Sequence, residues 1–308
     1  MSTECDLTRV SAPGHRERLT HPRRAEVRAR FLSRHLIFFP HFRRLLLRYV
    51  VPRAIAIIPA RFESTRFPGK PLAPLVDRTL IEWVWRGTSA AKRIEKVLVA
   101  TDDERIAAAV RGFGGEAVMT PSGFATGTDR IAHVASGLDA EVIVNVQGDE
   151  PLVTGESLDR LVAAFDDAAV DAATLREPFD ASGDLFDPNQ VKVVVAASGD
   201  ALYFSRSPIP YFRGKGHLSF DFRSVLFQKA DALAGYWKHV GIYAYRRQVL
   251  MDFARCAPTP LETAEGLEQL RLLETGRRMR VLDSGFRSVG VDTPFDLQRA
   301  ALVIQARG

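Results

Sequence analysis

Short apolar segments and amphipathic segments alternate along the chain after residue 50, and this alternation limits the fold more than any other feature. The apolar segments at residues 54–58, 96–100 and 141–146 are rich in Ile and Val, which favours buried strands of a parallel sheet. The segments between them have the spacing of apolar residues that is typical of helices. We therefore expect an α/β fold, a Rossmann-like and mostly parallel sheet flanked by helices. The expected helices are residues 79–93, 103–112 and 128–137.

The pattern changes after about residue 172. Strand-like segments at residues 191–196, 201–205 and 239–245 follow one another with few helices between them, and a long loop joins the last two. We expect an inserted antiparallel, strand-rich subdomain over about residues 185–245, which serves as a lid or a dimer contact. Helical spacing returns at residues 261–275 and 294–307.

A cationic loop follows the first expected strand, in the sequence IAIIPARFESTRFPGKP. Three prolines stop a helix from continuing through it, and Gly69 permits backbone angles that other residues resist. Arg61 and Arg66 can grip phosphate oxygens as planar forks, Lys70 is a point charge, and Ser64 adds a hydroxyl donor. The loop has neither the P-loop pattern nor the Rossmann glycine pattern. It is either a polyphosphate site or a solvated basic loop.

Two aspartates follow short apolar runs. Asp149 comes after IVNVQG and Asp292 after SVGV, so both are expected at the carboxyl ends of strands, where α/β sheets bind ligands. Two such carboxylates can share a Mg²⁺ ion that takes its other ligands from water and substrate phosphates. The alternative for Asp292 is a structural one, since an Asp before Thr-Pro is a natural N-cap for the last helix.

Further polar residues lie at the ends of expected elements. Arg130 stands in the first turn of a helix, where a cation opposes the helix dipole, so it is a candidate for ligand contact. Arg206 ends one expected strand, His239 begins another, and Glu268 and Gln269 lie on a helix. Each of these is individually explained by an ordinary structural role. Together they can bind a carboxylate and several hydroxyl groups, as an acidic sugar requires.

The first 50 residues differ from the rest of the chain. They hold 11 Arg and 4 acidic residues and carry a formal charge of +7, which leaves −2 for the remainder of a chain with net charge +5. The globular part therefore gives no reason to expect nucleic-acid binding. We expect the segment to be a basic extension that is disordered or lies upstream of the true start. A membrane-surface amphipathic helix and an organellar transit peptide are alternatives.

Membrane insertion and disulfide bonding are not expected. No apolar run approaches the length of a membrane span, so no integral membrane segment is predicted. Two cysteines allow at most one disulfide, which is consistent with a reducing cytoplasm.

Nine motifs in order resemble those of the 3-deoxy-manno-octulosonate cytidylyltransferases, the CMP-Kdo synthetase family. They cover nearly all of residues 53–305 and read IPARFESTRFPGKPL, LVATDDERI, TGTDRIA, IVNVQGDEPLV, DPNQVKVV, ALYFSRSPIP, HVGIYAYR, PLETAEGLEQLR and GVDTPFDL. The resemblance implies a fold of the nucleotide-diphospho-sugar transferase type. It also implies a Mg²⁺-dependent nucleotidyltransferase that joins Kdo, an eight-carbon sugar acid, to CMP from CTP, for lipopolysaccharide biosynthesis.

The resemblance also implies roles for individual residues. Lys70, Asp149 and Arg61 match catalytic positions, and Asp149 and Asp292 match metal ligands. Nucleotide-binding positions are matched by Arg61, Ser64, Arg66, Lys70, Arg130 and Gln147, and sugar-acid positions by Arg206, His239, Glu268 and Gln269. A cytoplasmic homodimer is implied as well. Relatives that use 8-amino-Kdo or a sialic acid share much of the scaffold, so the sugar acid stays open within this group.

Overall fold

The computed structural model describes residues 52–64, 66–179, 184–211, 233 and 235–306. The basic extension expected at residues 1–50 lies outside the described residues, as do residues 212–232 of the expected strand-rich subdomain. The interpretations placed on those segments therefore stay predictions.

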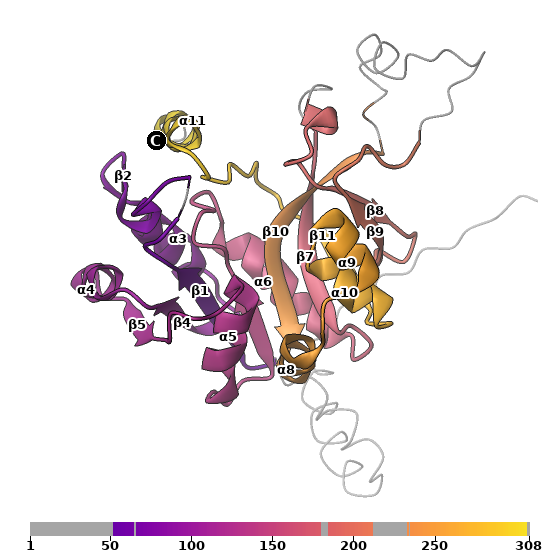
Figure 1. Ribbon diagram of the computed structural model, residues 1–308, viewed down its shortest axis with the longest axis horizontal. Coiled ribbons are helices and arrows are strands. Elements are labelled where there is room, and N and C mark those ends of the chain that lie inside the picture. The colour runs from indigo at the N-terminus through magenta and orange to yellow at the C-terminus, as the bar shows by residue number, and fades with distance from the viewer. Residues whose placement is uncertain (1–51, 65, 180–183, 212–232, 234, 307–308) are drawn as a thin grey trace, which may run out of the picture. The chain divides into compact units, whose positions relative to one another are not determined.

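A mixed sheet with helices packed on it forms the centre of the described chain (Figure 1). Its main strands lie in the order β11-β7-β10-β6-β1-β4-β5, and every pairing along this path is parallel except the two made by β10. The strands are β1 Ala54–Ala60, β4 Ile94–Thr101, β5 Glu116–Met119, β6 Val142–Asn145, β7 Ala172–Pro178, β10 Trp237–Arg246 and β11 Met279–Asp283. The predicted α/β fold class is confirmed.

Both faces of the sheet are covered by helices because both sets of alternating strand residues are apolar. In β1, Ala54, Ala56 and Ile58 belong to one core cluster, and Ile55 and Ile57 belong to the other. The first cluster includes residues of α3 Leu80–Ser89, α4 Glu104–Gly112 and α6 Gly155–Ala163. The second includes residues of α5 Gly127–Ser136, α8 Arg247–Arg255 and α10 Gln269–Glu274. A parallel strand that is buried on both faces has a continuous apolar sequence, as β1 does.

The strand-rich segment is continuous with the main sheet. β8 Lys192–Val195 and β9 Ala201–Ser205 form an antiparallel pair, and β8 pairs with β10. β10 then runs on into the middle of the sheet, between β6 and β7 (Figure 1). The expected antiparallel insertion is thus tied to the sheet through β10, and its lid or dimer role stays a prediction.

Local sequence explains most of the boundaries of helices and strands, but one expected helix is wrong. The single helix expected at residues 261–275 is two helices, α9 Pro260–Glu265 and α10, because Gly266 takes a left-handed conformation at φ 62° and ends α9. α6, α8, β7 and β11 were not anticipated. In the described part of the chain, no helix has the length and apolar character needed to cross a membrane.

The last helix, α11 Pro294–Gln305, packs beside β2 Pro74–Leu75 (Figure 1). A small core cluster joins Ala300 of α11 to Leu75, Leu80 and Val291. Short elements complete this region and the loops: η1 Lys70–Leu72, β2 Pro74–Leu75, β3 Arg78–Thr79, η2 Ala164–Asp166 and η3 Asp184–Phe186.

Candidate active site

The loop between β1 and η1 bends back on itself and carries cations into a cavity. Gly69 has φ 70°, and its N–H donates to the carbonyl of Phe62 at 2.9 Å. A Cβ at this position would lie 3.1 Å from the Phe62 ring, so both the positive φ angle and the limited space favour glycine. The cavity has a volume of about 420 Å³, and its lining includes Arg61, Ser64, Arg66, Lys70, Arg130, Gln147, Asp149 and Asp292.

The Lys70 ammonium group joins the two aspartates that the sequence singled out. Its Nζ lies 2.7 Å from a carboxylate oxygen of Asp149 and 3.4 Å from one of Asp292. Arg66 also pairs with Asp292, at 3.1 Å. The N–H of Val291 donates to the carbonyl of Asp149 at 2.9 Å, which fixes the two segments side by side. Two carboxylates far apart in the sequence thus converge on one cation.

Asp292 is free to serve the site because another residue caps α11. The side chain of Thr293 accepts a hydrogen bond from the N–H of Asp296, and the Asp296 carboxylate accepts one from the N–H of Thr293. This reciprocal pair is a complete capping box. The alternative in which Asp292 acts as the N-cap is therefore wrong.

Arg130 is buried at the edge of the cationic cavity. Its guanidinium donates to the hydroxyl of Thr120 at 2.6 Å and pairs with Asp102 at 2.7 Å. Only 1% of the side chain is exposed, so Asp102 supplies the compensating charge that such a buried cation needs. Arg130 also lines an adjoining cavity of about 820 Å³, together with Arg61 and Ser64. The two cavities share these lining residues, and each has a volume in the range of ligand-binding pockets.

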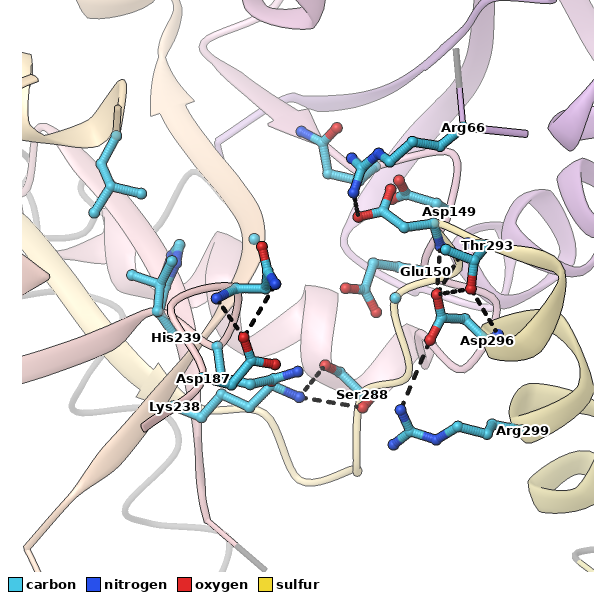
Figure 2. A pocket seen from close by; sticks show the side chains of 18 of the residues that line it. Arg66, Asp149, Glu150, Asp187, Lys238, His239, Ser288, Thr293, Asp296 and Arg299 are labelled. Carbon is cyan, nitrogen blue, oxygen red and sulfur yellow. Dashed lines mark hydrogen bonds and ion pairs between the residues drawn. The ribbon is translucent and has the colours of Figure 1, made fainter. Parts of the chain in front are cut away.

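A further cavity, of about 480 Å³, lies on the other side of the aspartates from the cationic cavity, and we call it the second cavity (Figure 2). Lys238 and His239 of β10 lie across it from Arg66 and Asp149 (Figure 2). Four lining residues are shared with the cationic cavity: Arg66, Gln147, Asp149 and Asp292. The two cavities therefore meet at the carboxylate pair, where molecules bound in each would come into contact.

Comparison with known proteins identifies the family. The model of a family described as Cytidylyltransferase matches residues 55–279. A 3-deoxy-manno-octulosonate cytidylyltransferase of Geobacter metallireducens is 51% identical over 245 residues, which are 79% of this chain and 94% of that protein. One from Myxococcus xanthus is 50% identical over 257 residues, 83% of this chain and 98% of the relative. The chain belongs to the 3-deoxy-manno-octulosonate cytidylyltransferase family.

Solved structures agree with this family assignment. A structure described as CMP:2-keto-3-deoxy-manno-octonic acid synthetase complexed with CTP is similar with a TM-score of 0.73 and 38% identity, over 83% of this chain and all of that one. A 4-diphosphocytidyl-2C-methyl-D-erythritol synthase of Anaerococcus prevotii is similar with a TM-score of 0.54 at 12% identity. The second likeness extends to the fold alone.

The site of this cytidylyltransferase brings together two of the four residues expected around the sugar acid. His239 and Gln269 line the second cavity. Arg206 and Glu268 do not appear in its lining. Arg206 donates instead to the carbonyls of Glu265 at 2.7 Å, Pro188 at 2.9 Å and Gly266 at 3.2 Å. The sugar contact expected of Arg206 stays a prediction.

Glu268 connects the segment before α10 to α5. Its carboxylate accepts a hydrogen bond from the hydroxyl of Thr128 at 2.8 Å, and Thr128 lies on α5, the helix that also carries Arg130. Burial raises the pKa of Glu268, and the nearby Asp129 adds to the effect, whereas the Thr128 bond opposes it. Its sugar contact also stays a prediction.

Sequence reasoning missed several groups around the second cavity. Lys238 pairs with Glu177 at 2.8 Å and donates to the side chain of Ser288 at 3.3 Å. Burial raises the pKa of Glu150 to about 8, and its neighbour Asp149 adds to the effect. One carboxylate oxygen of Glu150 is buried without a hydrogen-bond partner in the described structure. Lys238 and Glu150 each lie beside a residue that was predicted, and the sequence alone does not show that their side chains line the cavity.

Asp149 and Asp292 fit the requirements of a hard divalent cation. Both carboxylates reach the same point at Lys70, and about 30% and 49% of their side chains are exposed, which leaves room for water and phosphate ligands. The described residues hold no group of three or more His, Cys, Asp or Glu suited to enclosing a metal. The donor set is therefore of the kind that binds Mg²⁺ through one or two carboxylates together with substrate phosphates.

Proposed function

We propose that this protein transfers the cytidylyl group of CTP to Kdo and releases pyrophosphate. The observation that carries the proposal is the meeting of two cavities at Asp149 and Asp292. One is rich in cations, and the other is lined by both charged and neutral polar side chains, among them Lys238, His239 and Gln269. The anomeric hydroxyl of Kdo forms a bond to the α-phosphorus, and the bond from that phosphorus to the bridging oxygen breaks. Pyrophosphate leaves with the electron pair, and the product is CMP-Kdo.

The nucleotide lies in the cationic cavity, between Arg130 and the loop after β1. Arg61, Ser64, Arg66 and Lys70 grip its triphosphate oxygens, and Arg130 and Gln147 contact the nucleotide from the far side of the cavity. Arg61 and Lys70 neutralise the charge that develops on the α-phosphate and the departing pyrophosphate. Cations held in place before the reaction act by preorganised electrostatics, so no covalent intermediate is required.

Mg²⁺ is the cofactor in this proposal, held by Asp149 and Asp292. When bound, it supplies charge neutralisation to the phosphate oxygens. Lys70 pairs with both aspartates and lines the same cavity, so its ammonium group is within the space assigned to the triphosphate. Asp149 also lies at the junction of the cavities, where it can accept the proton of the attacking hydroxyl.

The sugar acid occupies the second cavity. His239 and Gln269 contact its hydroxyl groups from the cavity wall, and Lys238 supplies positive charge for its carboxylate. Arg206 and Glu268 take part by holding the surrounding backbone and α5 in place. We propose further that the enzyme is a cytoplasmic homodimer and that it uses no nucleic-acid partner.

A panel of substrates tests the proposal. The full chain is incubated with Mg²⁺ and each combination of CTP, UTP, ATP or GTP with Kdo, 8-amino-Kdo or a sialic acid, and pyrophosphate is measured. We expect the fastest release from CTP with Kdo. No release above the control without sugar would refute the proposal, and faster release with 8-amino-Kdo or a sialic acid would reassign the sugar.

A further inference from the structure

A bulge in β10 lies directly beside His239. The pairing of β10 with β7 matches Val240 with Leu175 and Tyr243 with Thr174, so Gly241 and Ile242 have no partner residues in β7. A bulge of this kind interrupts the backbone ladder and leaves carbonyl groups to be satisfied in another way. Here the hydroxyl group of Thr174 in β7 is the hydrogen-bond partner of these carbonyl groups.

The hydroxyl of Thr174 makes three contacts and has one proton to donate. Its oxygen lies 2.9 Å from the carbonyl oxygen of Ile242, 3.3 Å from that of Val240 and 2.9 Å from Nε2 of His239. Carbonyl oxygens only accept hydrogen bonds, so the proton points at them, principally at Ile242. The hydroxyl oxygen must then accept a hydrogen bond from His239, and Nε2 must carry a proton.

The reverse arrangement is unfavourable. If Thr174 donated to His239, its lone pairs would face both carbonyl oxygens at a fully buried position. A buried carbonyl or hydroxyl that loses its partner costs about 1–3 kcal/mol. Both carbonyls of the bulge would be affected at once, so the geometry selects one tautomer of the ring.

The other ring nitrogen of His239 is left for a ligand. Nδ1 has no hydrogen-bond partner among the described residues, and it is not one of the fully enclosed polar atoms that lack a partner. The residue lines the second cavity. Burial, with a smaller effect of Lys238, lowers the pKa of His239 to about 3, so the ring is neutral at physiological pH. A neutral ring with a proton on Nε2 presents Nδ1 as a hydrogen-bond acceptor.

We propose that Thr174 is a positioning residue that fixes the Nε2–H tautomer of His239, so that Nδ1 accepts a hydrogen bond from a hydroxyl group of the sugar acid. The nature of the ligand rests on the proposed function, whereas the tautomer does not. His239 does not donate to the carboxylate of the sugar acid, because the nitrogen that faces the cavity carries no proton.

The tautomer is measured first, without substrates. Long-range proton–nitrogen NMR spectra of the full chain, labelled with ¹⁵N in histidine, distinguish a protonated ring nitrogen from an unprotonated one. The His239 signals are assigned by their loss in His239→Gln. We expect a protonated Nε2 and an unprotonated Nδ1 in the wild-type protein. A protonated Nδ1 would overturn the proposal whatever the enzyme's substrate.

Variants then test the role of Thr174. Thr174→Val keeps the side-chain shape and removes the hydroxyl, and Thr174→Ser keeps the hydroxyl. Thr88→Val is the matched control, because Thr88 is also fully buried and donates to a carbonyl, that of Val84 at 2.7 Å, inside α3. We expect mixed His239 tautomers in Thr174→Val and the wild-type spectrum in the other two variants.

Kinetics with CTP and Kdo complete the test. In Thr174→Val we expect the KM for the sugar acid to rise about tenfold, which corresponds to one lost hydrogen bond, with the KM for CTP changed less than about twofold. Thr174→Ser should restore the wild-type KM, and Thr88→Val should change neither constant. Wild-type spectra and a wild-type KM for the sugar in Thr174→Val would overturn the proposal. If Thr174→Val does not fold, the proposal is tested by which ring nitrogen of His239 is protonated in the wild-type protein and in Thr174→Ser. Absence of turnover in the wild type would refute the proposed function and leave the tautomer result standing.

Discussion

The substitution Asp149→Asn separates the catalytic role of the carboxylate pair from its structural role. It removes one negative charge and keeps the shape of the side chain. In the structure, Lys70 lies 2.7 Å from Asp149 and 3.4 Å from Asp292, so the ammonium group loses one of two partners. The remaining oxygen of the amide still accepts a hydrogen bond from Lys70. The fold therefore loses little, whereas the cation site loses half of its protein charge.

The two effects differ in size. About 30% of the Asp149 side chain is exposed, and ion pairs near the surface contribute about 0–1 kcal/mol, so the free energy of unfolding should fall by about 1 kcal/mol at most. In a domain of this size that lowers the Tm by about 2–4 °C. Loss of one preorganised electrostatic group typically costs about 2.7–4 kcal/mol in the transition state. We therefore expect kcat to fall by a factor of about 100 to 1,000.

Both quantities can be measured on the same samples. Continuous pyrophosphate release with CTP and Kdo gives kcat, and thermal unfolding followed by circular dichroism gives the Tm. Asp283→Asn is the control, because Asp283 pairs with Arg176 at 2.8 Å and lines neither cavity. A kcat of Asp149→Asn within tenfold of the wild-type value would refute the role assigned to Asp149. A fall in Tm above about 10 °C would show that its role is mainly structural.

Three further predictions concern pH, backbone strain and the sugar cavity. Burial lowers the pKa of His239 to about 3 against about 6.5 in the unfolded chain, so the unfolded state binds more protons between these values. Its contribution to stability is present above about pH 6.5 and is lost as the pH falls towards about 3, by up to about 1.4 kcal/mol per pH unit. Urea unfolding at several pH values should therefore show a weaker pH dependence in His239→Gln, and an unchanged dependence would contradict the burial argument. Val76 has φ 57° although it is β-branched, so Val76→Asn should raise the free energy of unfolding by about 1 kcal/mol, and a lower denaturation midpoint would contradict this. Lys192 is buried and donates to the carbonyls of Asp187 and Gln190, in the loop that lines the sugar cavity. Lys192→Met should therefore raise the KM for Kdo about tenfold and leave the KM for CTP unchanged. Equal increases in both KM values would count against a local role of Lys192.

The fold and the centre of the site could be predicted because their signals are local. An Ile-rich run followed by a Pro- and Gly-punctuated cationic loop marks β1 and its loop, and Asp149 follows a similar run. The parallel arrangement of strands brings their carboxyl ends to one edge, so loops that lie far apart in the sequence are expected near one another. Asp149 follows β6, as that rule predicts. The strand expected before Asp292 is wrong, because residues 284–293 form a loop between β11 and α11, and the hydrogen bond from the N–H of Val291 to the Asp149 carbonyl brings Asp292 beside Asp149.

The features that could not be predicted depend on pairings between distant segments. β7 has the sequence AATLREP, which lacks a clear apolar pattern, and it is buried because β10 and β11 flank it. The antiparallel character of β10 was expected, but its place in the middle of the main sheet, between β6 and β7, was not, because no local pattern reveals that pairing. Arg206 ends a strand and reads as a free cation in the sequence. The turn at Gly266 places backbone carbonyls around its guanidinium instead.

An oxygen-18 label tests directly whether the two cavities hold CTP and Kdo so that the sugar hydroxyl attacks the α-phosphorus. The full chain is given CTP, Mg²⁺ and Kdo labelled with oxygen-18 at its anomeric hydroxyl, and the products are analysed by mass spectrometry at short times. The predicted result is CMP-Kdo that retains the label in its sugar–phosphate bridge, with an equal amount of unlabelled pyrophosphate. Absence of CMP-Kdo, or CMP-Kdo that has lost the label, would contradict the account.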